Sequence, residues 1–139
     1  MQKRSQPRHN QLRKGRRSIP GAYYSITIST HKRNPILANA QIANTIFETF
    51  DWLETQDRIK WTCIIVIPDH IHTIFQLGYT HSLSNVIKSL KTFTARQINK
   101  SLGRSGTFWQ SSFHDHVIRK DVSLKTIFAI IMKIPFGVG

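Results

Sequence analysis

The sequence has one cysteine, few acidic residues and no long hydrophobic run. A single cysteine cannot form a disulfide within the chain, and Cys63 lies in an apolar run where a buried structural thiol is expected rather than a nucleophile. No stretch reaches the roughly 18 to 20 apolar residues needed to span a bilayer. No apolar segment follows the basic start, so no secretory signal is expected. These absences favour a protein of the reducing cytoplasm with no membrane partner.

The shortage of acids leaves a strongly basic chain. Lys and Arg number 20 against 7 Asp and Glu, which gives a formal net charge of +13. Such a charge favours a polyanionic partner, most often nucleic acid. The 139 residues, 40% of them hydrophobic, suffice for one domain with a modest core. Residues 1–19 contain no acid, and we predict a basic arm there, either solvated or ordered on nucleic acid, before a domain at 20–139.

Hydrophobic periodicity predicts the order β-α-β-β-α-β followed by a last helix. Strands are expected at 22–30, 59–68, 71–77 and 112–119, and helices at 36–55, from 82 or 84 to about 99, and from 121 or 123 onward. This is the ferredoxin-like, split β-α-β plan of the α+β class, with a four-stranded antiparallel sheet, two helices on one face and a C-terminal helix. Because that fold hosts many functions, the function has to be inferred from the site.

Two histidines stand one residue apart in the stretch "VIPDHIHTIF". Side chains two apart on a strand point the same way, so His70 and His72 are expected on one face of the third strand. Two neutral imidazoles there can share a divalent ion if a third ligand comes from elsewhere. The alternative is a hydrogen-bonded surface histidine in a chance spacing. A second pair, His114 and His116, alternates in the same way. Asp69, just before His70, is expected to make the turn before the third strand rather than to bind metal.

The ordered motifs "IPDHIHTIFQLG", "SLKTFTARQIN" and "FWQSSFHDHVIR" resemble the REP-associated tyrosine transposases of the HUH superfamily, from about Ala22 to the last residue. The resemblance implies a bacterial, cytoplasmic enzyme that binds DNA hairpins and cleaves and rejoins single-stranded DNA in transposition. It implies that His70 and His72 hold Mg²⁺ or Mn²⁺, which polarises a phosphodiester for attack by a tyrosine on the last helix. Members of the family are often dimers, so a homodimer is also implied.

The last helix departs from the pattern of that family, Y-I-x-x-N-P-x-x-A-G. The aligned stretch is "IIMKIPFGVG", in which Ile130 stands at the tyrosine position and Ile134 at the asparagine that completes the metal site. Isoleucine can neither attack phosphorus nor bind a metal, so the expected nucleophile is missing. Only Tyr23, Tyr24 and Tyr79 remain, and Tyr79 is the nearest substitute.

Three explanations follow from this departure. The chain is a decayed relative that still binds DNA, or it is a truncated or altered copy. In the third explanation, the metal site recruits His114 or His116 and activates water instead of a tyrosine. The first two together are favoured because nucleophile and ligand are lost at once. Outside the transposases, the alternatives are a non-catalytic nucleic-acid binder, including an RNA-recognition sheet displaying Tyr23 or Tyr24, and a structural or metal-binding basic protein.

Candidate DNA contacts lie in several basic segments. Lys88 and Lys91 are one helical turn apart and are expected to form a patch that holds the hairpin backbone. Trp109 and Gln110 match the "WQ" element of the family, with a core role for Trp109 as the alternative to base stacking. The remaining candidates are Arg13, Lys14, Arg16, Arg17, Arg119 and Lys120.

Overall fold

The computed structural model describes residues 18–118, and within them strands and helices alternate in the predicted order. The elements are β1 (Tyr23–Ser29), α2 (Ala40–Thr55), β2 (Ile59–Ile67), β3 (His70–Leu77), α3 (Leu83–Leu102) and β4 (His114–Ile118), with short 3₁₀ turns at His31–Arg33 and Ile36–Ala38. The predicted last helix lies outside the described residues. The fourth strand is shorter than predicted at its start, and the third begins one residue earlier, so that it includes His70.

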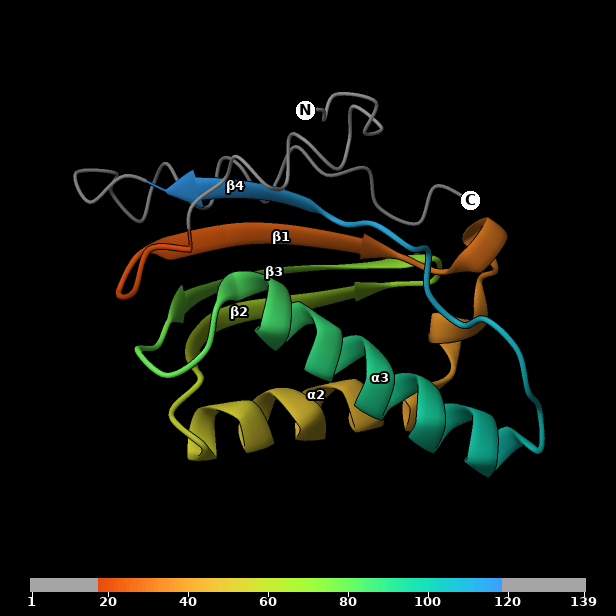
Figure 1. Cartoon of the computed structure of the whole chain (residues 1–139). Coiled ribbons are helices and arrows are strands. Elements are labelled where there is room, and N and C mark those ends of the chain that lie inside the picture. Colours follow the sequence, from red (N-terminus) through yellow and green to blue (C-terminus); the bar gives the residue numbers. More distant parts are fainter. Residues whose placement is uncertain (1–17, 119–139) are drawn as a thin grey trace, which may run out of the picture.

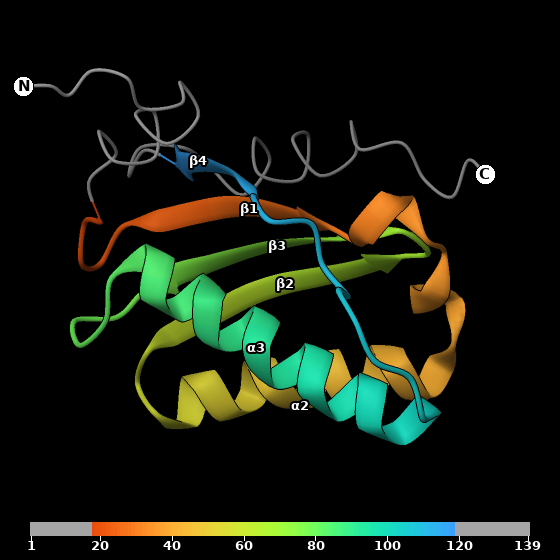
Figure 2. The ribbon, with the colours of Figure 1, turned by 45° about the vertical axis from the view of Figure 1, so that its right-hand side comes forward.

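The four strands form one sheet in the order β2-β3-β1-β4, with every neighbouring pair antiparallel. Helix α2 connects β1 to β2 across β3, and α3 connects β3 to β4 across β1. Both helices lie on the same face of the sheet (Figures 1 and 2). This arrangement confirms the ferredoxin-like plan.

The start of α2 differs from the prediction. Ile36–Ala38 form a separate 3₁₀ turn, and the helix begins at Ala40 because Asn39 caps it. The Oδ1 of Asn39 accepts from the backbone N–H groups of Gln41 and Ile42, at 2.8 and 3.3 Å. Side-chain capping of these otherwise unpaired donors fixes where a helix starts. The apolar periodicity continues through the 3₁₀ turn, which is why it suggested one longer helix.

Helix α3 has caps at both ends that the sequence indicates. Ser82, at one of the two predicted starts of this helix, caps it by accepting from the backbone N–H of Asn85 at 3.1 Å. At the other end, Gly103 adopts a left-handed φ of 62° and its N–H returns to the carbonyls of the last turn. The helix therefore runs to Leu102, slightly beyond the predicted end near residue 99.

The two faces of the sheet carry different side chains. The helix-covered face contributes Tyr24, Ile26, Ile28, Ile71 and Phe75 to the main core with α2 and α3. The opposite face, which we call the histidine face, carries His70, His72, His114 and His116 together with Ser25, Thr27 and Ile74, as the strand registers require. Side chains from β3 are buried on both faces, which explains its nearly continuous burial.

Gly78 follows β3 where the chain passes close to the turn before β2. A Cβ added there would lie 2.3 Å from the carbonyl oxygen of Asp57, so a larger residue would displace backbone. The Gly78 N–H donates to the Arg58 carbonyl at 2.8 Å. Glycine at this position therefore permits the close approach that ends the strand.

Candidate active site

The candidate site begins at the turn between β2 and β3. Pro68 and Asp69 make this turn, as predicted for Asp69, and β3 follows with the two histidines. His70 and His72 are 7% and 4% exposed and both lie on the histidine face, whereas Ile71 between them enters the main core. The predicted geometry of a histidine pair on one pleat is thus present on an inner strand of the sheet.

A carboxylate fixes the ring of His70. Its Nδ1 lies 2.8 Å from Oδ1 of Asp69, and since an ionised carboxylate only accepts, Nδ1 carries the hydrogen. The Nε2 lone pair then faces no hydrogen-bonding partner among residues 18–118. Arg33 holds the same carboxylate through Nε and Nη2, at 3.0 and 2.9 Å from Oδ2. Burial acts to raise the pKa of Asp69, but the His70 hydrogen bond and the Arg33 charge outweigh it, so that pKa lies below its ordinary value.

Two hydroxyl groups of β1 hold the ring of His72. Oγ of Ser25 lies 3.2 Å from Nε2, and Oγ1 of Thr27 lies 3.0 Å from Nδ1. Burial lowers the pKa of His72 to about 4, and the nearby His70 adds to this lowering. Near neutral pH the ring is therefore uncharged, which is the form that binds a metal.

The second histidine pair lies on the same face but does not join the first. Thr27 of β1 pairs with His72 on one side and with His114 on the other, so a whole strand separates the two pairs. Strands are ~4.8 Å apart, which puts His72 and His114 roughly 10 Å apart at the backbone. Within residues 18–118 no three His, Cys, Asp or Glu side chains come together as metal ligands. Recruitment of His114 or His116 as a third ligand is therefore not supported.

None of the three tyrosines of the chain lies at the histidine pair. Tyr79, the expected substitute, lies beyond the far end of β3, seven residues and roughly 23 Å along the chain from His72. Tyr24 is buried in the main core, and its hydroxyl accepts from the N–H of Ile19. Tyr23 lies on the histidine face but is four residues, about 13 Å, from the row of Thr27. Of the two tyrosines named for the RNA-recognition alternative, Tyr23 is the one that this face displays.

The expected DNA contacts separate into exposed and structural residues. Lys88 is exposed on α3, but Lys91 is half-buried and its Nζ donates to the Gln110 carbonyl at 2.6 Å, so the two lysines do not form one free patch. Trp109 is 4% exposed, and its Nε1–H donates to Oγ1 of Thr94 at 2.9 Å. The core alternative therefore describes Trp109, and base stacking does not.

Several predicted site residues lie outside the described residues. They are Arg13, Lys14, Arg16 and Arg17 of the arm, Arg119 and Lys120 after β4, and Ile130 at the tyrosine position. The last two residues of the predicted arm are described, and both contact the domain. Oγ of Ser18 accepts from the N–H of Leu83 at 2.8 Å, and the Ile19 N–H donates to Tyr24.

Three residues around the histidines were not predicted from the sequence. The alternation in "YYSITIS" already places Ser25 and Thr27 on the face opposite Ile26, but only the pairing of β1 with β3 brings them to His72. Arg33 has a left-handed φ of 57° in the connection after β1, and no sequence pattern links it to Asp69.

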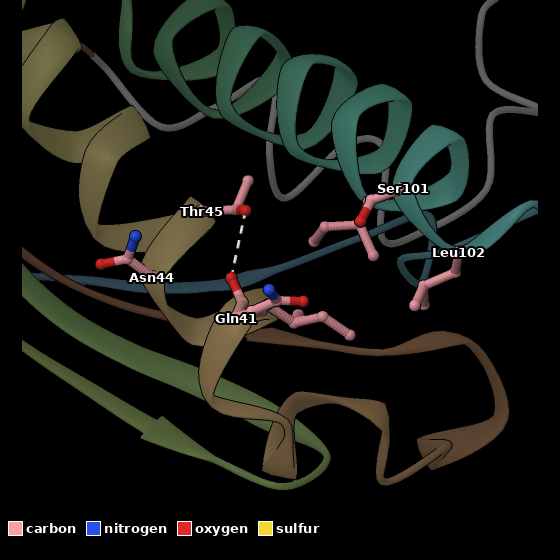
Figure 3. Close-up of a pocket in the computed structure, with 7 residues that line it drawn as sticks. Gln41, Asn44, Thr45, Ser101 and Leu102 are labelled. Carbon is pink, nitrogen blue, oxygen red and sulfur yellow. Dashed lines mark hydrogen bonds between the residues drawn. The ribbon is translucent and has the colours of Figure 1, made fainter.

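A separate pocket of about 260 Å³ lies between α2 and α3, away from the histidine face (Figure 3). Polar uncharged and apolar side chains line it: Gln41, Ile42, Asn44, Thr45, Ile98, Ser101 and Leu102. Thr45 is occupied by a hydrogen bond from its Oγ1 to the Gln41 carbonyl at 3.2 Å. The lining of this pocket contains no ionisable side chain, so it offers no general acid or base.

Two further expectations concern Cys63 and membranes. Burial raises the pKa of the Cys63 thiol, partly offset by a hydrogen bond with the Ile74 backbone, and the side chain packs against Ile74 and Ile118. This agrees with a structural thiol. Among residues 18–118, neither helix combines the length and the hydropathy that a bilayer span needs.

Comparisons with known proteins agree with this fold. The fold resembles the structure of a REP-associated tyrosine transposase bound to a REP hairpin, with a TM-score of 0.63 and 20% identity over 83% of this chain and 66% of that one. It also resembles a protein from Deinococcus radiodurans R1 assigned to the transposases, with a TM-score of 0.60 and 18% identity over 86% of this chain and 94% of that one.

The chain thus spans just under two thirds of the REP-associated transposase. No curated protein matches the sequence. The sequence profile of the family described as "Transposase IS200 like" matches residues 18–133, which is most of the chain. The chain therefore belongs to the IS200-like transposase family.

Proposed function

We propose that this transposase-family chain binds single-stranded DNA with hairpins and holds Mg²⁺ or Mn²⁺ at His70 and His72. The observation that carries this proposal is the pair of buried imidazoles on one face of β3, each with a hydrogen-bond partner at Nδ1, with the ring of His72 uncharged near neutral pH. The similar REP-associated transposase, which is bound to a REP hairpin, and the net charge of +13 support DNA as the partner.

The residues present fit a divalent ion in part. Two histidines supply two ligands, and an ion of this kind commonly completes its shell with water and substrate phosphate. When bound, the ion would act as a Lewis acid on a phosphate oxygen and neutralise charge that develops in the transition state. The chain itself contributes the two hydrogen-bonded rings and the Asp69 carboxylate that orients His70.

The DNA has to contact more than one side of the domain. Lys88 lies on α3, which covers the face opposite the histidines, so this lysine and the histidine pair cannot bind the same phosphate. We infer that the hairpin backbone contacts Lys88 and the basic arm while the single strand reaches the histidine face. Affinity should then fall steeply as the salt concentration rises.

We further propose that this copy binds DNA without forming the covalent tyrosine link that the family resemblance implies. The support is chemical, because isoleucine replaces tyrosine at position 130 and no tyrosine within residues 18–118 lies at the histidine pair.

Family resemblance also suggests a homodimer, and sedimentation of the purified chain with and without DNA would test it.

The test is a gel assay with labelled single-stranded hairpins and Mn²⁺. We expect retardation on a native gel, stronger with Mn²⁺, and no covalent adduct on a denaturing gel. Replacing both His70 and His72 by Ala should remove the Mn²⁺ effect. The matched control replaces His114 and His116 by Ala on the same face and should keep it.

Two outcomes would contradict the proposal. A chain that does not retard hairpin DNA at low salt is not a DNA binder of this type. A covalent adduct in the unmodified chain would show that an unexpected nucleophile works. The paired change Ile130→Tyr and Ile134→Asn is expected to create an adduct that depends on His70 and His72, which would identify the lost residues as the cause of inactivity.

A further inference from the structure

We propose that Thr27 positions His72 for metal binding by accepting a hydrogen bond from Nδ1–H, and that Ser25 occupies Nε2 only until the metal binds. This inference rests on the proposed metal site and assigns roles to two β1 residues that lie outside it. Both are positioning residues, since each acts through the imidazole.

The strand register gives the two hydroxyls unequal positions. Thr27 is directly paired with His72, so their Cβ atoms are roughly 5 Å apart, whereas Ser25 is paired with Ile74 and reaches His72 diagonally. The Thr27 contact is the shorter, 3.0 Å against 3.2 Å for Ser25. Thr27 is also β-branched, which restricts its rotamer on a strand, whereas the Ser25 hydroxyl rotates more freely.

The chemistry of the ring makes this difference useful. A neutral imidazole has one N–H and one lone pair, and a hydroxyl can either donate or accept, so the two hydroxyls satisfy His72 in either tautomer. Once a metal takes the Nε2 lone pair, Nδ1 must carry the hydrogen and needs an acceptor. Thr27 provides that acceptor, and the more mobile Ser25 hydroxyl gives up its contact with Nε2.

The same arrangement exists at His70 in a stronger form. Asp69 accepts from Nδ1–H of His70, so the carboxylate sets the tautomer and leaves the Nε2 lone pair available. With Thr27 at Nδ1 of His72, both rings are held by the same nitrogen and offer the same nitrogen to a shared ion. In each ring the hydrogen bond at Nδ1 fixes the tautomer that leaves Nε2 free as a ligand.

The first experiment measures Mn²⁺ affinity of the full chain with hairpin DNA by the electron paramagnetic resonance signal of free Mn²⁺. Loss of a group that holds a metal ligand typically weakens binding about 10- to 100-fold, which we expect for Thr27→Val. Thr27→Ser keeps the acceptor and should keep most of the affinity. Ser25→Ala removes a competitor for Nε2 and should leave the affinity unchanged or raise it.

Thr73→Val is the matched control for lost stability. Thr73 is fully buried in the same sheet and donates to the Cys63 carbonyl at 2.9 Å, but its side chain lies on the helix-covered face, opposite the ring of His72. This variant should lose stability without losing Mn²⁺ affinity. An equal loss of Mn²⁺ affinity in Thr73→Val and in Thr27→Val would show that Thr27 has only a structural role, and it would overturn the proposal.

The second experiment needs no metal. Nitrogen-15 shifts of His72 should show the Nδ1–H tautomer in the unmodified chain and the Nε2–H tautomer, donating to Ser25, in Thr27→Val. An Nε2–H ring in the unmodified chain, or a larger affinity loss in Ser25→Ala than in Thr27→Val, would contradict the assignment. If the unmodified chain bound no Mn²⁺, the proposed metal site would fail, while the tautomer result would still decide whether Thr27 holds the ring.

Discussion

Lowering the pH from 7 to 5 is expected to destabilise the fold through His72. Its pKa is about 4 in the folded chain against an ordinary value of 6.5 in the unfolded one. The folded state therefore binds fewer protons than the unfolded state between these values, so stability is present at neutral pH and is lost as the pH falls below 6.5.

The size of this effect follows from the two pKa values. At pH 5 the unfolded ring is almost fully protonated while the folded ring is mostly neutral, which corresponds to a loss of about 2 kcal/mol of unfolding free energy. Below pH 4 the loss approaches about 3 kcal/mol. For a domain of this size such a loss is a substantial part of the total stability.

The measurement compares urea unfolding of the unmodified chain and of His72→Gln at pH 7 and pH 5. Glutamine can bond to the same hydroxyls but does not titrate, so the pH dependence of the unmodified chain should exceed that of the variant by about 2 kcal/mol. The Asp69 carboxyl has a lowered pKa, so the stability that it contributes is lost only at more acidic pH. Both chains contain this carboxyl, so it does not affect the comparison. Equal pH dependence in the two chains would refute the assignment of a buried, neutral ring.

Further predictions concern Trp109, Asp69, Lys88 and Tyr79. Trp109→Phe should lower the unfolding free energy by about 2 kcal/mol, since it loses a buried hydrogen bond and leaves a void. Thr94→Val should lower the unfolding free energy less in the Trp109→Phe background than in the unmodified chain, which a double-mutant cycle by urea unfolding would show. Hairpin affinity of folded Trp109→Leu should be unchanged on native gels, whereas a weakened affinity would restore the stacking role. Asp69→Asn should weaken Mn²⁺ binding about 10-fold or more in a titration with hairpin DNA. Lys88→Ala should weaken hairpin binding and reduce the salt slope by about 1, and Tyr79→Phe should change no product on a denaturing gel.

The elements that were predicted well are those with strong local signals. The alternation of β1 and the apolar run of β2 gave the strands to within a residue or two, because those patterns reflect which side chains the sheet buries. The start of α2 was missed because Ile36 and Leu37 continue the apolar spacing while the backbone makes a 3₁₀ turn. A hydrogen-bonding preference at Asn39, rather than hydrophobicity, decides that boundary.

The sequence predicted only those features of the candidate site that depend on a single strand. The spacing of His70 and His72 determined their common face, and that prediction is confirmed. Their partners Ser25, Thr27 and Arg33 come from segments about 40 residues earlier, and pairing at that separation leaves no mark in local periodicity. Sequence separation also hides the hydrogen bond of Lys91, since its partner Gln110 lies on another segment.

The central position of β1 also affects the order in which the site can form. Strand β1 precedes the other three strands along the chain and lies between β3 and β4, and its contacts with His72 span 47 and 45 residues. Such non-local pairings form late and cooperatively, because the loop between the partners must close before any contact stabilises it. The histidine pair therefore has no ordered surroundings in a partly folded chain, and binding to the assembled site would stabilise the whole sheet at once.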